Sequence, residues 1–292
     1  MYGGRKSMNT AKFTTQLKKL TQMSEQQFLT PDALNWPSVL PKNQWCFKPE
    51  LISIYGSEQW YELTDAQKKK LSFYEAINFF SLNVHGEKYL INAVSSHLFN
   101  LPSLEMSEYL LHFIEEEAKH MMYFSRFCIQ YANKIYPLRA LEIGAPRDDE
   151  IELLLLFARI YIFETIVDEY NRQIASDSNV IGIVSEINRL HHLEESRHLA
   201  FGLGFLKYWL TELHDHIDEQ QLQQINQHLN GFLHNTWKQF YCPDAYFDAG
   251  LTDCASLSLA VFNSEPAKQH RDKLQHKRLA WFYHQQLLGD VA

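Results

Sequence analysis

Carboxylates and imidazoles interrupt the apolar side of four consecutive stretches of this sequence. The last of them, HHLEESRHLAFG, places His191, Glu195 and His198 at the spacing i, i+4 and i+7. On an α-helix these three side chains fall within about 40° of one another, so they share one stripe. Oxygen and nitrogen donors on one stripe suit a metal ion, provided that other segments supply further ligands.

The other three stretches each carry an acid among apolar residues. Glu87 lies in FFSLNVHGEKYLINAV, Glu117 and His120 lie in FIEEEAKHMMYF, and Glu164 lies in FARIYIFETIVDEY. The pattern over the four stretches is Glu, Glu-x-x-His, Glu, and His-x-x-x-Glu-x-x-His. This is the ligand arrangement of di-iron and di-manganese carboxylate bundles, in which side chains from four helices point inward. Oxygen and nitrogen ligands of this mix favour iron or manganese over zinc.

Charge decides between a metal centre and a plain helical scaffold. A single Glu-x-x-His is commonly a solvated helix face, but four buried carboxylates without counter-charge would each cost several kcal/mol. The cations nearest to them in the sequence, Lys88, Lys119 and Arg197, project off the apolar stripes. Two divalent metal ions would balance the four carboxylates, and the sequence therefore predicts a dinuclear centre.

Several polar neighbours of these residues are predicted to lie outside the centre. Glu115 and Glu116 point off the stripe and are expected in solvent. Glu194 precedes Arg197 by three residues, which is typical of an ion pair on a helix surface.

Two further polar residues lie close to the predicted ligands. His192 is expected to be exposed or to lie behind the ligands. Asp168, one turn after Glu164, could accept a hydrogen bond from a ligand imidazole, although a plain place on the helix surface is as good an interpretation.

The substrate pocket is predicted to have apolar walls that include Asn83 and Val84. A small acid would need a cation, typically an arginine, and the turn before Glu87 contains none. We therefore expect a neutral or larger amine as substrate, unless a loop or the N-terminal region supplies a cation such as Arg147 or Lys48.

The helical period predicts one all-α domain over 1–292. An irregular N-terminal wrap with short helices is expected over 1–64, a ligand-bearing core over 65–213, and C-terminal helices over 214–292. The core would be a ferritin-like four-helix bundle with flanking helices outside it. The helices are expected near 65–98, 106–134, 148–175, 180–213 and 217–241, with a last one after Ser264 where Pro266 fits a first turn.

Composition excludes several classes of protein. The 292 residues are 46% hydrophobic with a net charge of −8, so the chain is globular and an unlikely partner for nucleic acid. The longest apolar run, LLLLFARIYIF, is too short to cross a membrane. Four scattered cysteines form no Cys-x-x-Cys motif. A cytoplasmic protein is expected.

The third histidine makes the pattern more specific, because most ferritin-like di-iron proteins have two histidine ligands. With His191 four residues before the last Glu-x-x-His, HHLEESRHLAFG resembles the para-aminobenzoate N-oxygenase family, the arylamine oxygenases of antibiotic biosynthesis. The resemblance covers roughly residues 65–210. It implies two irons, with manganese as a possible substitute, held by Glu87, Glu117, His120, Glu164, His191, Glu195 and His198.

The resemblance also implies an activity. The family uses dioxygen to take an amine through hydroxylamine and nitroso towards nitro products, usually as a homodimer. Electrons would come from a separate reductase or small reductant, since the sequence has no flavin or nicotinamide motif. Three alternatives stay open: a hydroxylase or desaturase that acts on carbon, a ferritin-like iron-oxidising protein, and a metal-free helical scaffold.

Overall fold

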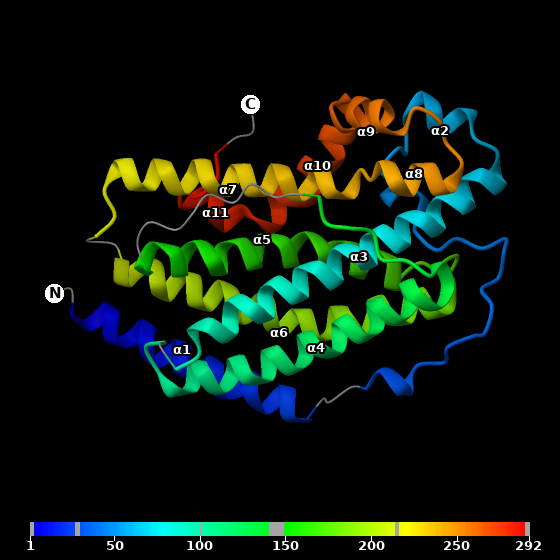
Figure 1. Ribbon diagram of the computed structural model, residues 1–292. Coiled ribbons are helices and arrows are strands. Elements are labelled where there is room, and N and C mark those ends of the chain that lie inside the picture. The colour runs from blue at the N-terminus through cyan, green and yellow to red at the C-terminus, as the bar shows by residue number, and fades with distance from the viewer. Residues whose placement is uncertain (1–2, 27–29, 100, 140–148, 214–215, 290–292) are drawn as a thin grey trace.

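The computed structural model describes residues 3–26, 30–99, 101–139, 149–213 and 216–289. The chain is all-α, with a ferritin-like bundle at its centre and further helices packed outside (Figure 1). Its elements are α1 (Gly3–Gln26), η1 (Pro31–Ala33), η2 (Pro49–Leu51), α2 (Glu58–Glu62), α3 (Asp65–His97), α4 (Leu104–Ala132), α5 (Asp149–Ala175), α6 (Gly182–Leu213), α7 (Glu219–Phe240), α8 (Pro243–Ala249), α9 (Cys254–Phe262), α10 (Glu265–Arg278) and α11 (Ala280–His284).

The helix starts follow local capping chemistry. Thr64 and Gln67 form a reciprocal capping box at the start of α3, Asp218 and Gln221 form another at α7, and the Ser103 hydroxyl caps α4. Such caps satisfy backbone N–H groups that have no partner within the helix. The five long helices predicted from periodicity therefore begin and end within a few residues of the expected positions.

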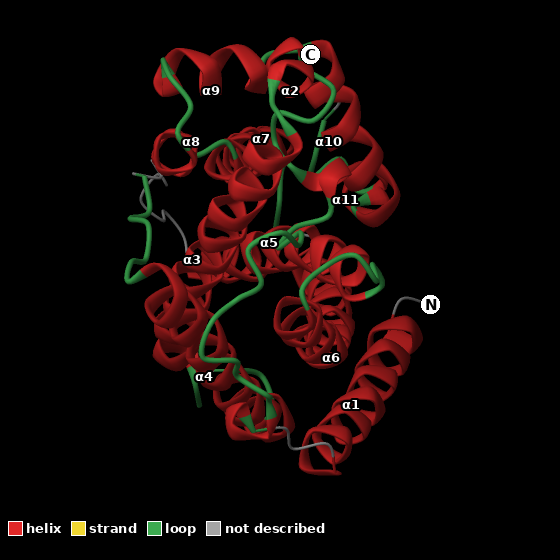
Figure 2. Ribbon diagram, turned by 90° about the vertical axis from the view of Figure 1, so that its right-hand side faces the viewer, coloured by secondary structure: helices red, strands yellow, loops and turns green. Residues whose placement is uncertain are grey.

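Two helix pairs form the bundle, α3 with α4 and α5 with α6. Seen from the end, the four helices surround a common interior, and α7 lies across α3 and α5 (Figure 2). The C-terminal helices α10 and α11 continue this outer layer, and α10 packs on α5. The interior of the bundle is thus reached by side chains from all four long helices.

The N-terminal region differs from the expected irregular wrap. Residues 3–26 form the helix α1, which packs against both α4 and α6. Among residues 11–26 of α1, whose side chains are described, the buried ones are Phe13, Leu17, Leu20 and Ser24. Because α1 is strongly polar, its helical periodicity in the sequence was weak. Residues 30–64 do form short, irregular elements, as predicted.

The C-terminal region holds one confirmed prediction and one short helix that the sequence analysis did not identify. Pro266 lies in the first turn of α10 behind the capping residue Ser264, as the sequence predicts. Residues 243–249 form the short helix α8; Pro243 starts it, and Gly250 ends it with φ = +94°, a conformation that glycine adopts readily. Among the described residues, no helix is long and apolar enough to cross a membrane.

Candidate metal centre

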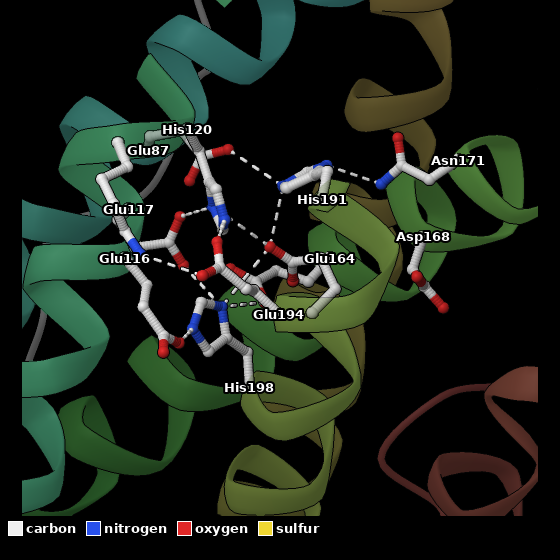
Figure 3. A network of polar contacts seen from close by, with 12 residues as sticks. Glu87, Glu116, Glu117, His120, Glu164, Asp168, Asn171, His191, Glu194 and His198 are labelled. Carbon is white, nitrogen blue, oxygen red and sulfur yellow. Dashed lines mark hydrogen bonds and ion pairs between the residues drawn. The ribbon is translucent and has the colours of Figure 1, made fainter. Parts of the chain in front are cut away.

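The structure brings together all seven side chains that the sequence singled out. Glu87 comes from α3, Glu117 and His120 from α4, Glu164 from α5, and the other three from α6 (Figure 3). Every one of them is at most 4% exposed. Their ligand atoms form overlapping groups within which all atoms lie within 4.8 Å of one another, and together these groups contain Glu87, Glu117, His120, Glu164, His191, Glu195 and His198.

Glu195 lies at the centre of the cluster. Its Oε1 is 2.8 Å from Nε2 of His191, 3.4 Å from Nδ1 of His198 and 3.5 Å from Nδ1 of His120. Each imidazole also approaches a second carboxylate. Nε2 of His191 is 3.5 Å from Glu87, and Nδ1 of His198 is 2.8 Å from Glu117. The imidazoles therefore point their inner nitrogens at shared carboxylates, as ligands of two neighbouring ions would.

The cluster's inner atoms lack hydrogen-bond partners. The atoms concerned are Oε1 of Glu117, both oxygens of Glu195, Nε2 of His191 and Nδ1 of His198. Several of these atoms are close to one another but not in hydrogen-bonding geometry. Buried polar atoms without partners are rare in folded proteins because each costs free energy. These unpartnered atoms are the ones through which the side chains would bind a metal, so the residues present fit a metal centre.

The pKa values show how strongly like charges crowd here. Burial, together with the Glu117 carboxylate, raises the pKa of Glu87 well above its usual range. Burial and the Glu195 carboxylate likewise raise the pKa of Glu164 well above its usual range. Burial lowers the pKa of His120, but the Glu117 carboxylate outweighs it and the result is about 9. The repulsion among four clustered carboxylates is relieved either by bound protons or by metal cations.

A second layer of charged residues, which the sequence analysis placed in solvent, supports the cluster. Glu116 is only 3% exposed, accepts a hydrogen bond of 2.8 Å from Nε2 of His198, and pairs with Arg197 at 2.7 Å. Burial alone would raise the pKa of Glu116, but His198 and Arg197 lower it to about 2. Glu116 is therefore ionised and fixes His198 with Nδ1 facing the cluster. Glu115, by contrast, is exposed as predicted.

Glu194 repeats this arrangement from the facing helix. It accepts a hydrogen bond of 2.8 Å from Nε2 of His120 and one of 2.9 Å from the Lys119 ammonium, and Arg197 lies 3.7 Å away. The predicted proximity of Glu194 and Arg197 is confirmed. Its predicted place on the surface is wrong, because Glu194 is fully buried between α4 and α6.

A repeated motif explains this symmetry. Residues 116–120 read EEAKH and residues 194–198 read EESRH. In each copy the second Glu and the His face the cluster, while the first Glu reaches the His of the other copy. The repeat of Glu-Glu-x-Lys/Arg-His was the signal in the sequence that could have identified this layer.

The second layer is electrically neutral. Glu116 and Glu194 carry two negative charges, and Lys119 and Arg197 carry two positive ones. The cations of this layer are therefore already balanced within the layer, and two divalent ions would match the charge of the four inner carboxylates.

His191 is oriented by an asparagine rather than by an acid. Its Nδ1 lies 2.6 Å from the side-chain amide of Asn171. In the structure the amide Nδ2 faces this nitrogen, and Oδ1 of Asn171 has no partner. An imidazole that binds a metal through Nε2 carries its proton on Nδ1, and the Asn171 amide would have to be turned over for its oxygen to accept that proton. Asp168, expected as a possible partner of a ligand imidazole, instead contacts His192, which is partly exposed.

A cavity of about 250 Å³ lies between α3, α5 and α7. Neither predicted pocket residue lines it: Asn83 is buried and donates to its own helix at Phe79, and Val84 is half-buried elsewhere on α3. Arg159 of α5 lines this cavity, so one of the ligand helices does bring a cation to it, which the sequence analysis did not identify. Lys48 does not line it, and Arg147 lies outside the described residues.

Comparison with known proteins gives one clear result. A family model described as P-aminobenzoate N-oxygenase AurF matches residues 11–280, which include α3 to α6 and every residue of the cluster. No curated protein matches the chain. Because the match spans most of its length, the chain belongs to this oxygenase family.

Proposed function

We propose that the chain, as a member of the P-aminobenzoate N-oxygenase family, is a non-haem di-iron oxygenase that N-oxygenates an aryl amine. The observation that supports this function is the buried cluster of four carboxylates and three imidazoles, in which five inner atoms have no hydrogen-bond partner. Two irons bound there would activate dioxygen for transfer to the amine nitrogen. The electrons would come from a separate reductase or small reductant.

We assign the metal ligands to the seven clustered residues. The ligands would be Glu87, Glu117, His120, Glu164, His191, Glu195 and His198. Glu116 and Glu194 would hold two imidazoles with their inner nitrogens toward the metals. Phe113 and Phe124 pack against His198 and His191, respectively, and exclude water from that side of the cluster.

Metal analysis tests the centre directly. We expect about two irons per chain after expression with iron, and manganese could occupy the same ligands without supporting activity. Well under one metal per chain after reconstitution would refute the centre and favour a metal-free scaffold.

His191 tests the full ligand set. We expect His191→Ala to fold, because the change shortens a side chain within a long helix, but to lose oxygen reactivity. A matched control is His192→Ala on the next residue, whose side chain faces Asp168 instead of the cluster. Equal loss of activity in both variants would count against a ligand role for His191.

The atom that is oxidised needs a separate experiment, because the metal ligands do not determine it. Mass spectrometry of products from a panel of amines, with reduced protein and oxygen, distinguishes hydroxylamine, nitroso and nitro products from carbon hydroxylation or desaturation. Products oxidised only at carbon would replace N-oxygenation with the hydroxylase or desaturase alternative.

We also propose that the chain forms a homodimer in a cytoplasmic biosynthetic pathway. Apolar side chains are exposed along the outside of α4, namely Leu104, Leu111, Met122 and Ile129, and a second copy would cover such a surface. Sedimentation velocity measures the assembly. A shell of many subunits would favour the iron-oxidising alternative instead.

A further inference from the structure

Three basic side chains gather around one phenylalanine where α7, α9 and α10 meet, in the layer outside the bundle (Figure 1). The guanidinium of Arg271 lies 4.2 Å from the centre of the Phe262 ring, and the Lys238 ammonium lies 5.9 Å from it. The His234 ring meets the same phenylalanine edge-on, with 5.2 Å between the ring centres. Two cations and an imidazole are therefore held at one place, and none of them belongs to the proposed metal ligands.

Arg271 lacks the acidic partner that a buried arginine needs. The residue is 9% exposed, and among the described residues its one hydrogen bond runs from Nη1 to the Tyr241 hydroxyl, at 3.0 Å. Asp272, its neighbour in the sequence, accepts a hydrogen bond from Gln275 and forms no ion pair with Arg271. A buried charge without a counter-charge is costly, so an anion from outside the chain would stabilise this arginine.

The free donors of Arg271 can be reached from outside the protein. Nε and Nη2 have no hydrogen-bond partner among the described residues, yet both keep solvent-accessible surface, unlike the fully buried Nε of Arg159. The Nε–H and Nη2–H groups lie on the same edge of the guanidinium. This edge donates two parallel hydrogen bonds to the oxygens of a phosphate or a carboxylate.

The surroundings of Arg271 carry positive charge. Burial lowers the pKa of His234, and the charges of Lys238 and Arg271 lower it further. Burial likewise lowers the pKa of His270 to about 4, with Arg271 and Lys273 adding to the effect. Both imidazoles are therefore uncharged at neutral pH, while Lys238 and Arg271 form no ion pair with a described residue. A group with two negative charges matches these two cations better than a carboxylate with one.

We propose that Arg271 and Lys238 bind the doubly charged group of a phosphate monoester. The free edge of Arg271 would hold two phosphate oxygens, and the exposed Lys238 would supply the second positive charge. The Phe262 and Tyr241 rings, 4.2 and 5.5 Å from the guanidinium carbon, already hold that group in place, so little freedom is lost on binding. This site goes beyond the proposed oxygenation, because it uses neither the metal ligands nor the cavity between α3, α5 and α7.

Calorimetry with inorganic phosphate in a low-salt buffer tests the site on the iron-loaded full chain. We expect one phosphate per chain with a dissociation constant below about 1 mM. Acetate should bind at least about tenfold more weakly, because it carries a single charge. The metal-free chain should bind phosphate equally well, which separates this site from the proposed metal centre, since iron ions also bind phosphate. No binding, equal affinity for acetate, or binding that is lost with the iron would overturn the proposal.

Matched variants locate the binding. Lys238→Gln should weaken phosphate binding at least about threefold, and Arg271→Lys, which keeps the charge but loses the two-pronged edge, at least about tenfold. The control is Lys18→Gln, which makes the same change of charge at an exposed position on α1, on the other side of the molecule from α9 (Figure 2). Because Lys238 is exposed, its variant keeps the test valid if Arg271→Lys fails to fold. Unchanged affinity in Lys238→Gln, or an equal loss in Lys18→Gln, refutes the assignment.

Two further probes distinguish the source of the phosphate. Glycerol 3-phosphate represents a soluble ester, and vesicles that contain phosphatidic acid represent a lipid headgroup. Binding of the soluble ester without sedimentation on vesicles assigns the site to a small metabolite. Sedimentation on vesicles that Lys238→Gln abolishes assigns it to a lipid. Binding of inorganic phosphate while both esters fail shows an adventitious ion only, and it overturns the proposal.

Discussion

The neutral second layer predicts strong coupling between Lys119 and Glu194. The ammonium lies 2.9 Å from the carboxylate, and the two side chains are only 8% and 0% exposed. Lys119→Met removes the cation that Glu194 pairs with. Glu194→Gln removes the anion and leaves the ammonium buried, although the new amide oxygen can still accept from His120. Each single substitution leaves the second layer with a net charge, whereas the double variant is neutral again.

The magnitudes follow from the burial of the pair. Removing one partner of a buried ion pair costs about 3–5 kcal/mol, because the other charge is left uncompensated. Replacing both partners with uncharged groups of similar size is far less costly, and we expect less than about 2 kcal/mol for the double variant. The coupling free energy between the two substitutions should therefore reach about 3 kcal/mol.

Urea unfolding of the four metal-free proteins measures this coupling. The control is the surface pair Glu186 and Arg189, whose side chains are 43% and 47% exposed. The coupling free energy of this pair should be less than about 1 kcal/mol. Iron content gives a second readout, since losing a partner of a ligand imidazole lowers metal affinity about 10–100-fold. Additive single effects at Lys119 and Glu194 would refute the neutral-layer argument.

Three further predictions concern other parts of the molecule. Burial raises the pKa of Glu75 from 4.5 to about 8, so the folded state binds the extra proton and its stability falls as the pH rises through this window. Urea unfolding should show a loss of about 2 kcal/mol in the free energy of unfolding between pH 6 and 8. A similar pH dependence of stability in Glu75→Gln would contradict this cause. Gly86→Ala should destabilise by about 1–3 kcal/mol through overpacking against Phe163, whose ring a Cβ at this position would approach within 2.4 Å, and Phe163→Leu should relieve the cost. Asn171→Leu should reduce iron content about tenfold or more by leaving His191 without the side-chain amide that orients it; unchanged iron would argue against that role.

The comparison of sequence and structure is clearest at the ligands. Glu87, Glu117, Glu164 and Glu195 were identifiable because each interrupts an apolar stripe, and a stripe of period 3.6 is a local property of the chain. The helices that carry them were predictable for the same reason, with caps such as Thr64 and Ser103 setting their starts. Helix α1 was missed because its described part, residues 11–26, buries a narrow apolar stripe that includes Phe13 and Leu17 and is otherwise mostly polar.

The residues next to the ligands were misplaced for a different reason. A helix with one buried stripe leaves its other sides to solvent, and on that assumption Glu116 and Glu194 belong on the surface. In the folded chain α4 and α6 pack against each other, and α1 packs on both. The sides of α4 and α6 that carry Glu116, Lys119 and Arg197 are therefore buried as well.

The sequence by itself determined the helices and the inward-facing donors, because both follow from spacing along one helix. Only the tertiary structure decided which charges neutralise one another, since Glu116 pairs with Arg197 across 81 residues and Glu194 with Lys119 across 75. It likewise placed Arg159 in a cavity, because a cavity exists only between packed helices. Pairing and enclosure depend on distances between helices, which no local pattern specifies.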